Sequence, residues 1–262
     1  MLRWIVSSIF VFLSCPATAG FLDTDSFSGV DVTTLREVTV HLEGIDKKYR
    51  ALGDMLLTDE DTQRAFSGTL WPHRRIIFAF DASVSDQNQA SFWDACKFWE
   101  NGTRIHCVQR TSESDFILVR SVALGGGVAG QSVVGWHKGE HTMELAQWDQ
   151  YTLVHEIGHA IGKAHEHQRS DASKYLTINK ANADPDQLGN LLPLRHTQNF
   201  VDHMDFNSVM FYWTDAFAKP PGFPVIVLNE EYKSYQDVIG HNSVPSADDL
   251  KDVATAYAKV AD

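Results

Sequence analysis

The chain has 262 residues, with 22 Lys and Arg against 34 Asp and Glu, so its formal net charge is -12 at pH 7. This length fits one or two compact domains, and an apolar content of 44% is enough for a sizeable core. The acidic balance disfavours nucleic acid as a partner, because a phosphate-binding surface needs clustered Lys and Arg. Twelve His, in contrast, direct attention to metal-ligand spacings.

The N-terminus has the pattern of a signal peptide. Arg3 precedes an apolar run at residues 4–13, which is shorter than the roughly 20 residues needed to span a bilayer. The small residues Ala17-Thr18-Ala19 follow and favour cleavage after Ala19. We therefore expect residues 1–19 to be a signal peptide, and the protein to be secreted or periplasmic with no membrane span. Acylation of Cys15 is the alternative.

Cys96 and Cys107 are the cysteines that remain after the signal peptide. In an oxidising compartment a disulfide across a helix-to-strand turn fits them, and two buried free thiols fit them equally well. Neither has the repeated Cys-x-x-Cys spacing of a thiolate zinc site.

Beyond residue 19, residues 20–64 scatter acidic side chains among short apolar runs, and denser patterns begin after Leu70-Trp71-Pro72. Three segments rich in apolar and β-branched residues are predicted as strands: 75–80, 115–122 and 132–136. Three segments are predicted as helices, the last one opening with a capping-box pattern: 89–99, 149–161 and 246–258. Early strands, a central helix and a proline-rich, loop-forming second half indicate an α+β fold.

Three histidines have the spacing of metal ligands. His155 and His159 are four residues apart on the predicted helix, so both imidazoles lie on one face and can reach one cation. Gly162 can adopt the left-handed conformation that ends a helix. The chain can then turn and bring back His165 as the third ligand.

Glu156 can act together with these three ligands, because its carboxylate can contact a water bound to the same ion. Three imidazoles and a water form an open, catalytic zinc site, whereas structural sites are closed by four protein ligands. Zinc lowers the pKa of that water to about 7, and Glu156 can accept its proton and pass it to a leaving amine. We therefore predict a peptide-bond hydrolase with one Zn²⁺ per chain. The alternative is a non-proteolytic, zinc-containing protein-binding module, in which Glu156 would have no use.

Residues 155–165 read His-Glu-x-x-His-x-x-Gly-x-x-His, which is similar to the metzincin zinc-peptidase signature. Glu166 directly after it, followed by Arg169, resembles the astacin family. Ser208-Val209-Met210-Phe211-Tyr212 resembles the Met-turn of that family, and the likeness covers about Leu70 to Tyr257. It implies a two-lobed catalytic domain, with a twisted mixed sheet and the active-site helix above a zinc cleft and a loop-rich C-terminal lobe below.

The resemblance implies further roles. Glu166 would be structural and meet the α-amino group of the matured chain. Met210 would form an apolar floor beneath the zinc, and Tyr212 would stabilise the oxyanion and act as an additional zinc ligand. Without their place after the zinc motif, Met210 and Tyr212 would more often be core residues.

Residues 53–57 (GDMLL) resemble the Gly-Asp switch of astacin propeptides. Asp54 would then replace the water on zinc and keep the enzyme latent; an ordinary turn carboxylate is the alternative. The resemblance implies a propeptide at 20–64 and a catalytic domain at 65–262. An activating protease would cleave between about 61 and 68, with Arg64-Ala65 as one trypsin-like site. A protein or peptide substrate would pair with the strand edge at 131–136.

Three positions depart from the family pattern. Ala51 stands where the switch usually has Phe, and Phe211 where the Met-turn commonly has His. Arg104 stands where one disulfide cysteine is expected, so the two disulfides typical of the family are absent. No pattern predicts an oligomeric state.

Overall fold

The structure is a computed structural model that describes residues 36–42, 45–58, 69–124, 128–194 and 201–261. The expected signal peptide and the expected cleavage region at 61–68 lie outside these residues. Among the helices that the structure describes, none is long and apolar enough to cross a membrane.

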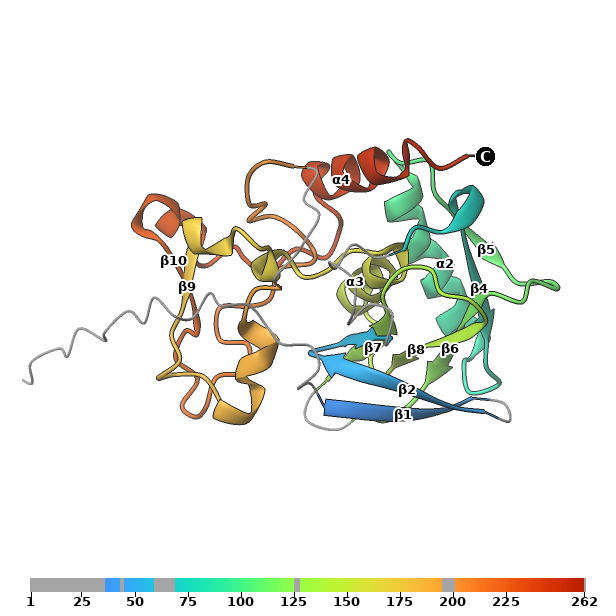
Figure 1. Ribbon diagram of the computed structural model, residues 1–262, viewed down its shortest axis with the longest axis horizontal. Helices are drawn as coiled ribbons and strands as arrows, with labels where there is room; N and C mark the ends of the chain where they lie inside the picture. The colour runs from blue at the N-terminus through green and yellow to red at the C-terminus, as the bar shows by residue number, and fades with distance from the viewer. Residues whose placement is uncertain (1–35, 43–44, 59–68, 125–127, 195–200, 262) are drawn as a thin grey trace, which may run out of the picture.

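An eight-stranded mixed sheet forms one half of the molecule (Figure 1). In spatial order its strands are β1 (Arg36–Leu42), β2 (Ile45–Leu52), β3 (Met55–Leu57), β7 (Gly130–Val133), β8 (Glu140–Leu145), β6 (Phe116–Ser121), β4 (Arg75–Phe80) and β5 (His106–Gln109). Strands β8, β6, β4 and β5 are parallel, and β7 runs antiparallel to β8. The strand β3 joins β7 in parallel and carries the antiparallel strands β2 and β1.

The predicted strands are confirmed, with one shift. β4 has the predicted bounds and β6 lies within 115–122, but β7 spans Gly130–Val133 rather than 132–136. The chain leaves the ladder at Gly135, where φ is +69°, and the Gly135 N–H donates to the carbonyl of His159. That carbonyl lies on the central helix, so β7 ends where it meets the helix.

Strands β1 to β3 were not predicted. Residues Leu52, Met55, Leu56 and Leu57 are fully buried, and Met55 lies opposite Ser132 of β7. The described part of the segment expected to be a propeptide thus contributes three strands to the sheet.

Helices α2 (Asp86–Glu100) and α3 (Gln150–Ile161) lie on one face of the sheet, and α4 (Ala247–Tyr257) lies near the end of the chain (Figure 1). Each begins at a residue whose side chain accepts a backbone N–H: Ser85, Asp149 and Ser246. The capping box of Ser246 and Asp249 is present as predicted. The indole of Trp99 donates to the Val154 carbonyl and fixes α2 against α3.

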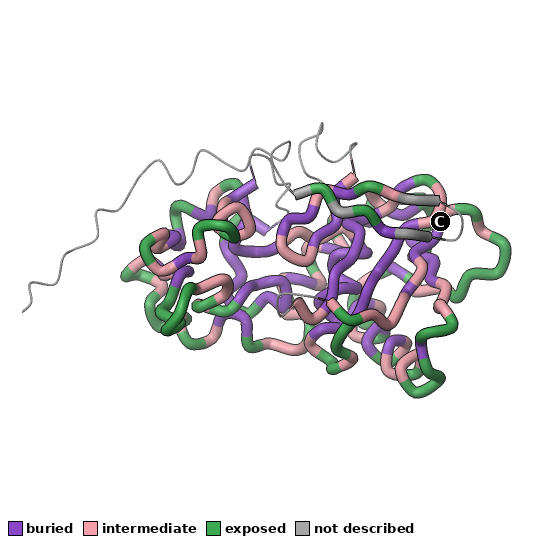
Figure 2. Tube along the Cα trace, turned by 90° about the horizontal axis from the view of Figure 1, so that it is seen from below, coloured by how far each residue is buried: buried purple, intermediate pink, exposed green. Residues whose placement is uncertain are grey.

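The second half of the chain is loop-rich, as predicted. It contains a two-stranded sheet of β9 (Leu176–Ile178) and β10 (Ile226–Leu228). Short 3-10 helices complete the described elements: Pro72–Arg74, Glu166–Gln168, Ala172–Lys174, Pro185–Leu191 and Glu230–Tyr235. This half has a hydrophobic core of its own, separate from the core between sheet and helices. Figure 2 shows buried chain running through both halves, with exposed residues on the outer loops. The α+β prediction is confirmed.

Asp249 joins α4 to the loop at 208–210. Its side chain is 1% exposed and accepts hydrogen bonds from Ser208 Oγ at 2.7 Å and Val209 N at 3.0 Å. The ammonium of Lys163, just past α3, lies 3.2 Å from the same carboxylate. One buried carboxylate therefore connects three separate parts of the chain.

We expect Asp249→Ala to lower the free energy of unfolding by about 3–5 kcal/mol, because it removes one of the two carboxylates paired with Lys163 and leaves Ser208 Oγ and Val209 N buried without their acceptor. At this chain size that corresponds to a melting temperature lower by roughly 6–20 °C. Asp252→Ala is the matched control, since Asp252 also pairs with Lys163, at 3.0 Å, but is 24% exposed; its expected cost is at most about 1 kcal/mol. Equal shifts for the two variants in thermal unfolding would contradict this role of Asp249.

Candidate active site

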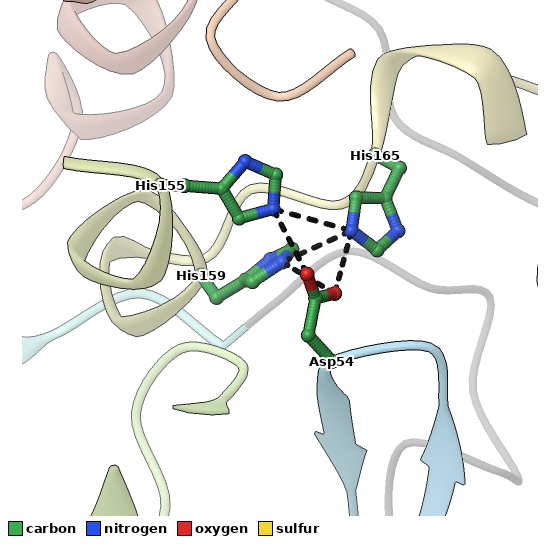
Figure 3. Close-up of side chains that lie close together, drawn as sticks. All are labelled: Asp54, His155, His159 and His165. Atoms are coloured by element: carbon green, nitrogen blue, oxygen red, sulfur yellow. Dashed lines mark hydrogen bonds and ion pairs between the residues drawn. The ribbon is translucent and has the colours of Figure 1, made fainter. Parts of the chain in front are cut away.

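Four side chains converge between the two halves of the chain: Asp54, His155, His159 and His165 (Figure 3). The Nε2 atom of His165 lies 3.3 Å from that of His155 and 3.2 Å from that of His159. The Asp54 carboxylate faces all three rings, with Oδ1 2.7 Å from His165 Nε2 and 3.3 Å from His159 Nε2, and Oδ2 3.3 Å from His155 Nε2. The three rings are buried.

A hydrogen bond at Nδ1 orients each ring. The three acceptors, each 2.7 or 2.8 Å away, are the Val209 carbonyl for His155, the Lys163 carbonyl for His159 and Gln168 Oε1 for His165. Because Nδ1 carries the donated proton, Nε2 of each neutral ring directs a lone pair at the centre of the cluster. Three lone pairs at this distance repel one another unless a cation lies between them.

The cluster fits Zn²⁺. Zinc–nitrogen distances of about 2.0–2.1 Å in a tetrahedral site place neighbouring nitrogens about 3.3 Å apart, and the observed separations are 3.3 and 3.2 Å. Imidazole nitrogens and a carboxylate oxygen are also ordinary zinc donors.

The local sequence produces this geometry. One turn of α3 separates His155 from His159, and Gly162, at φ +118°, ends the helix as predicted. The chain then reverses and returns His165 to the same centre. The spacing of His155, His159 and His165 in the sequence thus places their Nε2 atoms around one centre.

Met210 and Tyr212 also lie where they were expected, beside the cluster. A Cβ atom at Gly158 of α3 would be 2.5 Å from Met210 Sδ, so a larger residue there would displace this methionine. The Tyr212 ring centroid is 4.1 Å from that of His165, and its hydroxyl donates to Asp54 Oδ1 at 3.0 Å. Burial and the Asp54 charge raise the pKa of Tyr212 well above its usual value.

Glu156, on α3, is buried against Gly130 at the start of β7. A Cβ atom at Gly130 would be 2.7 Å from Glu156 Oε1, so the glycine makes room for the carboxylate. Glu156 Oε2 is buried without a hydrogen-bond partner among the described residues. Burial and the charge of Asp54 raise the pKa of Glu156 well above its usual value. A carboxylate in this state beside a metal-ligand cluster is suited to take up a proton.

Asp54 and His159 are each in the form that binds a cation at neutral pH. Burial would raise the pKa of Asp54, but the charges of His165 and His155, with hydrogen bonds from His155 and His159, outweigh it and hold the pKa well below its usual range. Burial lowers the pKa of His159 to about 4. At neutral pH the cluster therefore combines an anionic carboxylate with a neutral imidazole at His159.

A family model described as Astacin, a peptidase family, matches residues 63–258. The chain belongs to the astacin family of zinc metallopeptidases. Its predicted family, fold class and enzyme class are confirmed. The predicted roles of the individual site residues remain predictions.

Relatives of this astacin agree with the family assignment. It is 26% identical over 212 residues to astacin-like metalloprotease toxin 1 of Loxosceles intermedia, covering 73% of this chain and 79% of the toxin. It is 30% identical over 165 residues to zinc metalloproteinase nas-5 of Caenorhabditis elegans, covering 60% of this chain but only 44% of that relative. Among solved structures it is similar to high choriolytic enzyme 1, a hatching enzyme zinc-protease of Oryzias latipes. There the identity is 26%, the TM-score is 0.64, and the match covers 74% of this chain and 94% of that one.

Glu166 of this astacin is buried and faces the C-terminal half. It accepts a hydrogen bond from Asp205 N at 2.9 Å and lies 3.4 Å from Arg169 Nη1. Burial raises its pKa to about 7, against the charges of Lys163 and Arg169. The expected contact with a new α-amino group involves residues 61–68, outside the described part, and stays a prediction.

Cys96 and Cys107 are free thiols, Cys96 buried and Cys107 half-buried, so the structure favours the second of the two alternatives for this pair. Trp136 and Trp148 pack against the core of the sheet half.

Three residues that position the site were not predicted. Gln168 orients His165, Gly130 admits Glu156, and Asn190 Oδ1 accepts the Gly53 N–H at 2.9 Å. Gln168 follows His165 by three residues, which is a signal that could have been used. The other two act only through tertiary contacts and leave no local pattern.

Proposed function

We propose that this zinc metallopeptidase is an endopeptidase of proteins, made as an exported zymogen. Residues 1–19 direct export, 20–64 form a prosegment and 65–262 form the catalytic domain. His155, His159 and His165 hold the zinc, and Glu156 is the general base. The observation that carries the proposal is the convergence of three Nε2 atoms beside Glu156 Oε2, which has no hydrogen-bond partner in the part of the chain that the structure describes.

Zinc, when bound by the three histidines, supplies the Lewis acidity that lowers the pKa of a water and polarises a peptide carbonyl. Glu156 Oε2 accepts the proton of the attacking water and then donates it to the leaving amine. Its raised pKa lets it hold the proton between these two steps. Tyr212, once released from Asp54, donates its hydroxyl to the developing oxyanion. Met210 supports the helix turn that carries Glu156 and two of the ligands.

Two contacts of the prosegment support latency. Asp54 faces the ligand nitrogens, and β3 pairs with β7, where Asp54 O accepts the Ser132 N–H at 2.9 Å. We expect a substrate to pair with the edge of β7. Because β3 already occupies that edge, it excludes the substrate. At Gly53, with φ +64°, a Cβ atom would be 2.2 Å from the Tyr212 hydroxyl oxygen, so the turn that presents Asp54 needs glycine.

Asp54→Ala in the full chain is expected to raise basal peptide hydrolysis by about 10–100-fold, because it removes charge-assisted contacts worth about 1.5–3 kcal/mol. Turnover of a quenched peptide measures the effect. Glu37→Ala is the control, since Glu37 is another acidic side chain of the same segment but lies exposed on β1 beside Lys48. Equal activity of the two variants would contradict the latch.

The proposed function itself is tested with the zinc-loaded full chain, before and after limited proteolysis by a trypsin-like enzyme. We expect turnover of a quenched peptide library to increase when the chain is cut between residues 61 and 68. The new α-amino group then becomes available to Glu166. A cut chain that binds one zinc but cleaves no peptide would instead favour the non-proteolytic binding module.

A further inference from the structure

Two aromatic rings that the mechanism does not use lie beside the ligand cluster. Tyr151 is in the first turn of α3, and Trp213 follows Tyr212 directly. Their ring centroids are 5.1 Å apart at an interplanar angle of 35°, and the Tyr151 ring is 5.6 Å from that of His155. The rings of Trp213, Tyr151 and His155 therefore form a continuous row that leads to the proposed zinc ligands.

The same segment of the chain holds both rings in place. Gln150, next to Tyr151, donates through Nε2 to the carbonyl and to the hydroxyl of Ser243, both at 3.2 Å. Gly240 has φ +79°, and a Cβ atom there would be 2.5 Å from the backbone nitrogen of Trp213. Residues 240–243 thus fix α3 and the chain after Tyr212 relative to each other, so the aromatic pair is a preorganised surface.

One ring of this pair is open to solvent while the described part of the prosegment is in place, and the other is half-buried. Trp213 is 41% exposed, although large apolar side chains are mostly buried in the described part of the chain. The Tyr151 hydroxyl has no hydrogen-bond partner among the described residues, yet it feels the charges of Asp54 and Glu156, which with burial raise its pKa. Tyr151 therefore lies close to the proposed catalytic centre. An exposed apolar surface at this place indicates contact with a substrate.

We propose that Tyr151 and Trp213 form a specificity subsite for a large apolar side chain, aromatic or leucine, on a substrate residue next to the scissile bond. The proposal rests on the proposed function. Two adjacent, tilted rings offer such a side chain an offset or edge-on aromatic contact. Asp149, the N-cap of α3 and two residues before Tyr151, accepts hydrogen bonds from Thr152 N at 3.1 Å and from Thr152 Oγ1 at 2.8 Å. Both of its oxygens are therefore already hydrogen-bonded at the start of the helix.

The test compares peptides that carry Phe, Leu, Gly or Arg at either position flanking the cleaved bond. The enzyme is the zinc-loaded full chain, cut between residues 61 and 68. We expect kcat/KM to favour Phe and Leu over Gly by about 10–200-fold at one of the two positions. Trp213→Ala and Tyr151→Ala should reduce this ratio to roughly 3-fold or less, whereas Tyr151→Phe, which keeps the ring, should preserve it.

Phe223→Ala is the matched control, because Phe223 is 59% exposed and, within the described part of the chain, makes no ring contact with the aromatic pair. In this variant, the ratio of kcat/KM for Phe and Leu peptides to kcat/KM for Gly peptides should equal that of the unaltered chain. An equal loss in Phe223→Ala, an unchanged ratio in Trp213→Ala, or a preference for Arg would overturn the proposal.

A binding measurement separates this subsite from the catalytic proposal. In the cut, zinc-loaded Glu156→Gln chain, calorimetry gives the affinities of matched Phe and Gly peptides. We expect the Phe peptide to bind at least about 10-fold more tightly, and Trp213→Ala to remove the difference. Equal affinities would overturn the subsite even if the enzyme cleaves peptides. A clear preference without turnover in the unaltered chain would support the subsite and contradict only the proposed function.

Discussion

Glu156→Gln should reduce kcat for peptide hydrolysis by about 10²–10⁴-fold, the usual contribution of a positioned general base. The amide of Gln has the size of the carboxylate but cannot accept the proton of the attacking water. Steady-state kinetics on a quenched peptide, with the zinc content determined on the same sample, measures the effect. We expect one zinc per chain in the variant, because Glu156 is not one of the four residues whose ligand atoms cluster at the site.

Glu144→Gln is the matched control for this prediction. Glu144 is also a buried carboxylate, on β8, where it binds Gln131 Nε2 at 2.6 Å and Arg120 Nη1 at 3.1 Å, away from the cluster. Its kcat should stay within a few-fold of the unaltered enzyme. If Glu156→Gln kept a tenth or more of the activity, the assignment of the base would be wrong.

His159→Ala is expected to abolish both zinc binding at stoichiometric concentration and peptide hydrolysis. His159 is fully buried, and removing it leaves two imidazoles, which cannot complete the ligand set of a catalytic zinc site. Metal analysis after gel filtration gives the zinc content. Added zinc should raise the melting temperature of the unaltered chain, because a ligand of the native state stabilises it, but not that of the variant.

His203→Ala controls for loss of an imidazole. His203 is exposed and pairs with Asp202 and Asp248 at the surface. It should retain one zinc per chain and full activity. Stoichiometric zinc and normal turnover in His159→Ala would rule out this histidine as a ligand.

The site was predictable where its geometry is local. Two histidines four residues apart share a helix face in any α-helix, and Asp149 and Gly162 mark the ends of that helix by their own side-chain and backbone chemistry. The three Nε2 atoms therefore converge as the spacing indicated. The acceptors that orient them are less visible in the sequence, because two of the three are backbone carbonyls, which every residue carries.

The sheet was harder to predict than the helices. Strand β8 carries the polar residues Glu140, His141 and Glu144, so its sequence lacks the apolar run that predicts a buried central strand. Strand β2 begins with Ile45-Asp46-Lys47-Lys48, and it is ordered by pairing with β1 and β3 rather than by apolar alternation. The register of β3 on β7 is set by contacts between distant parts of the chain, and a local reading contains no information about such contacts.

We propose that three histidines and Glu156 make this chain a zinc peptidase. The most direct measurement is peptide turnover by the zinc-loaded full chain after limited proteolysis, with zinc content determined on the same sample. We predict one zinc per chain and turnover that is lost on chelation, restored by added zinc and lost in Glu156→Gln. One bound zinc without turnover, or turnover that survives both chelation and the Glu156→Gln change, would contradict this assignment of the zinc ligands and the base.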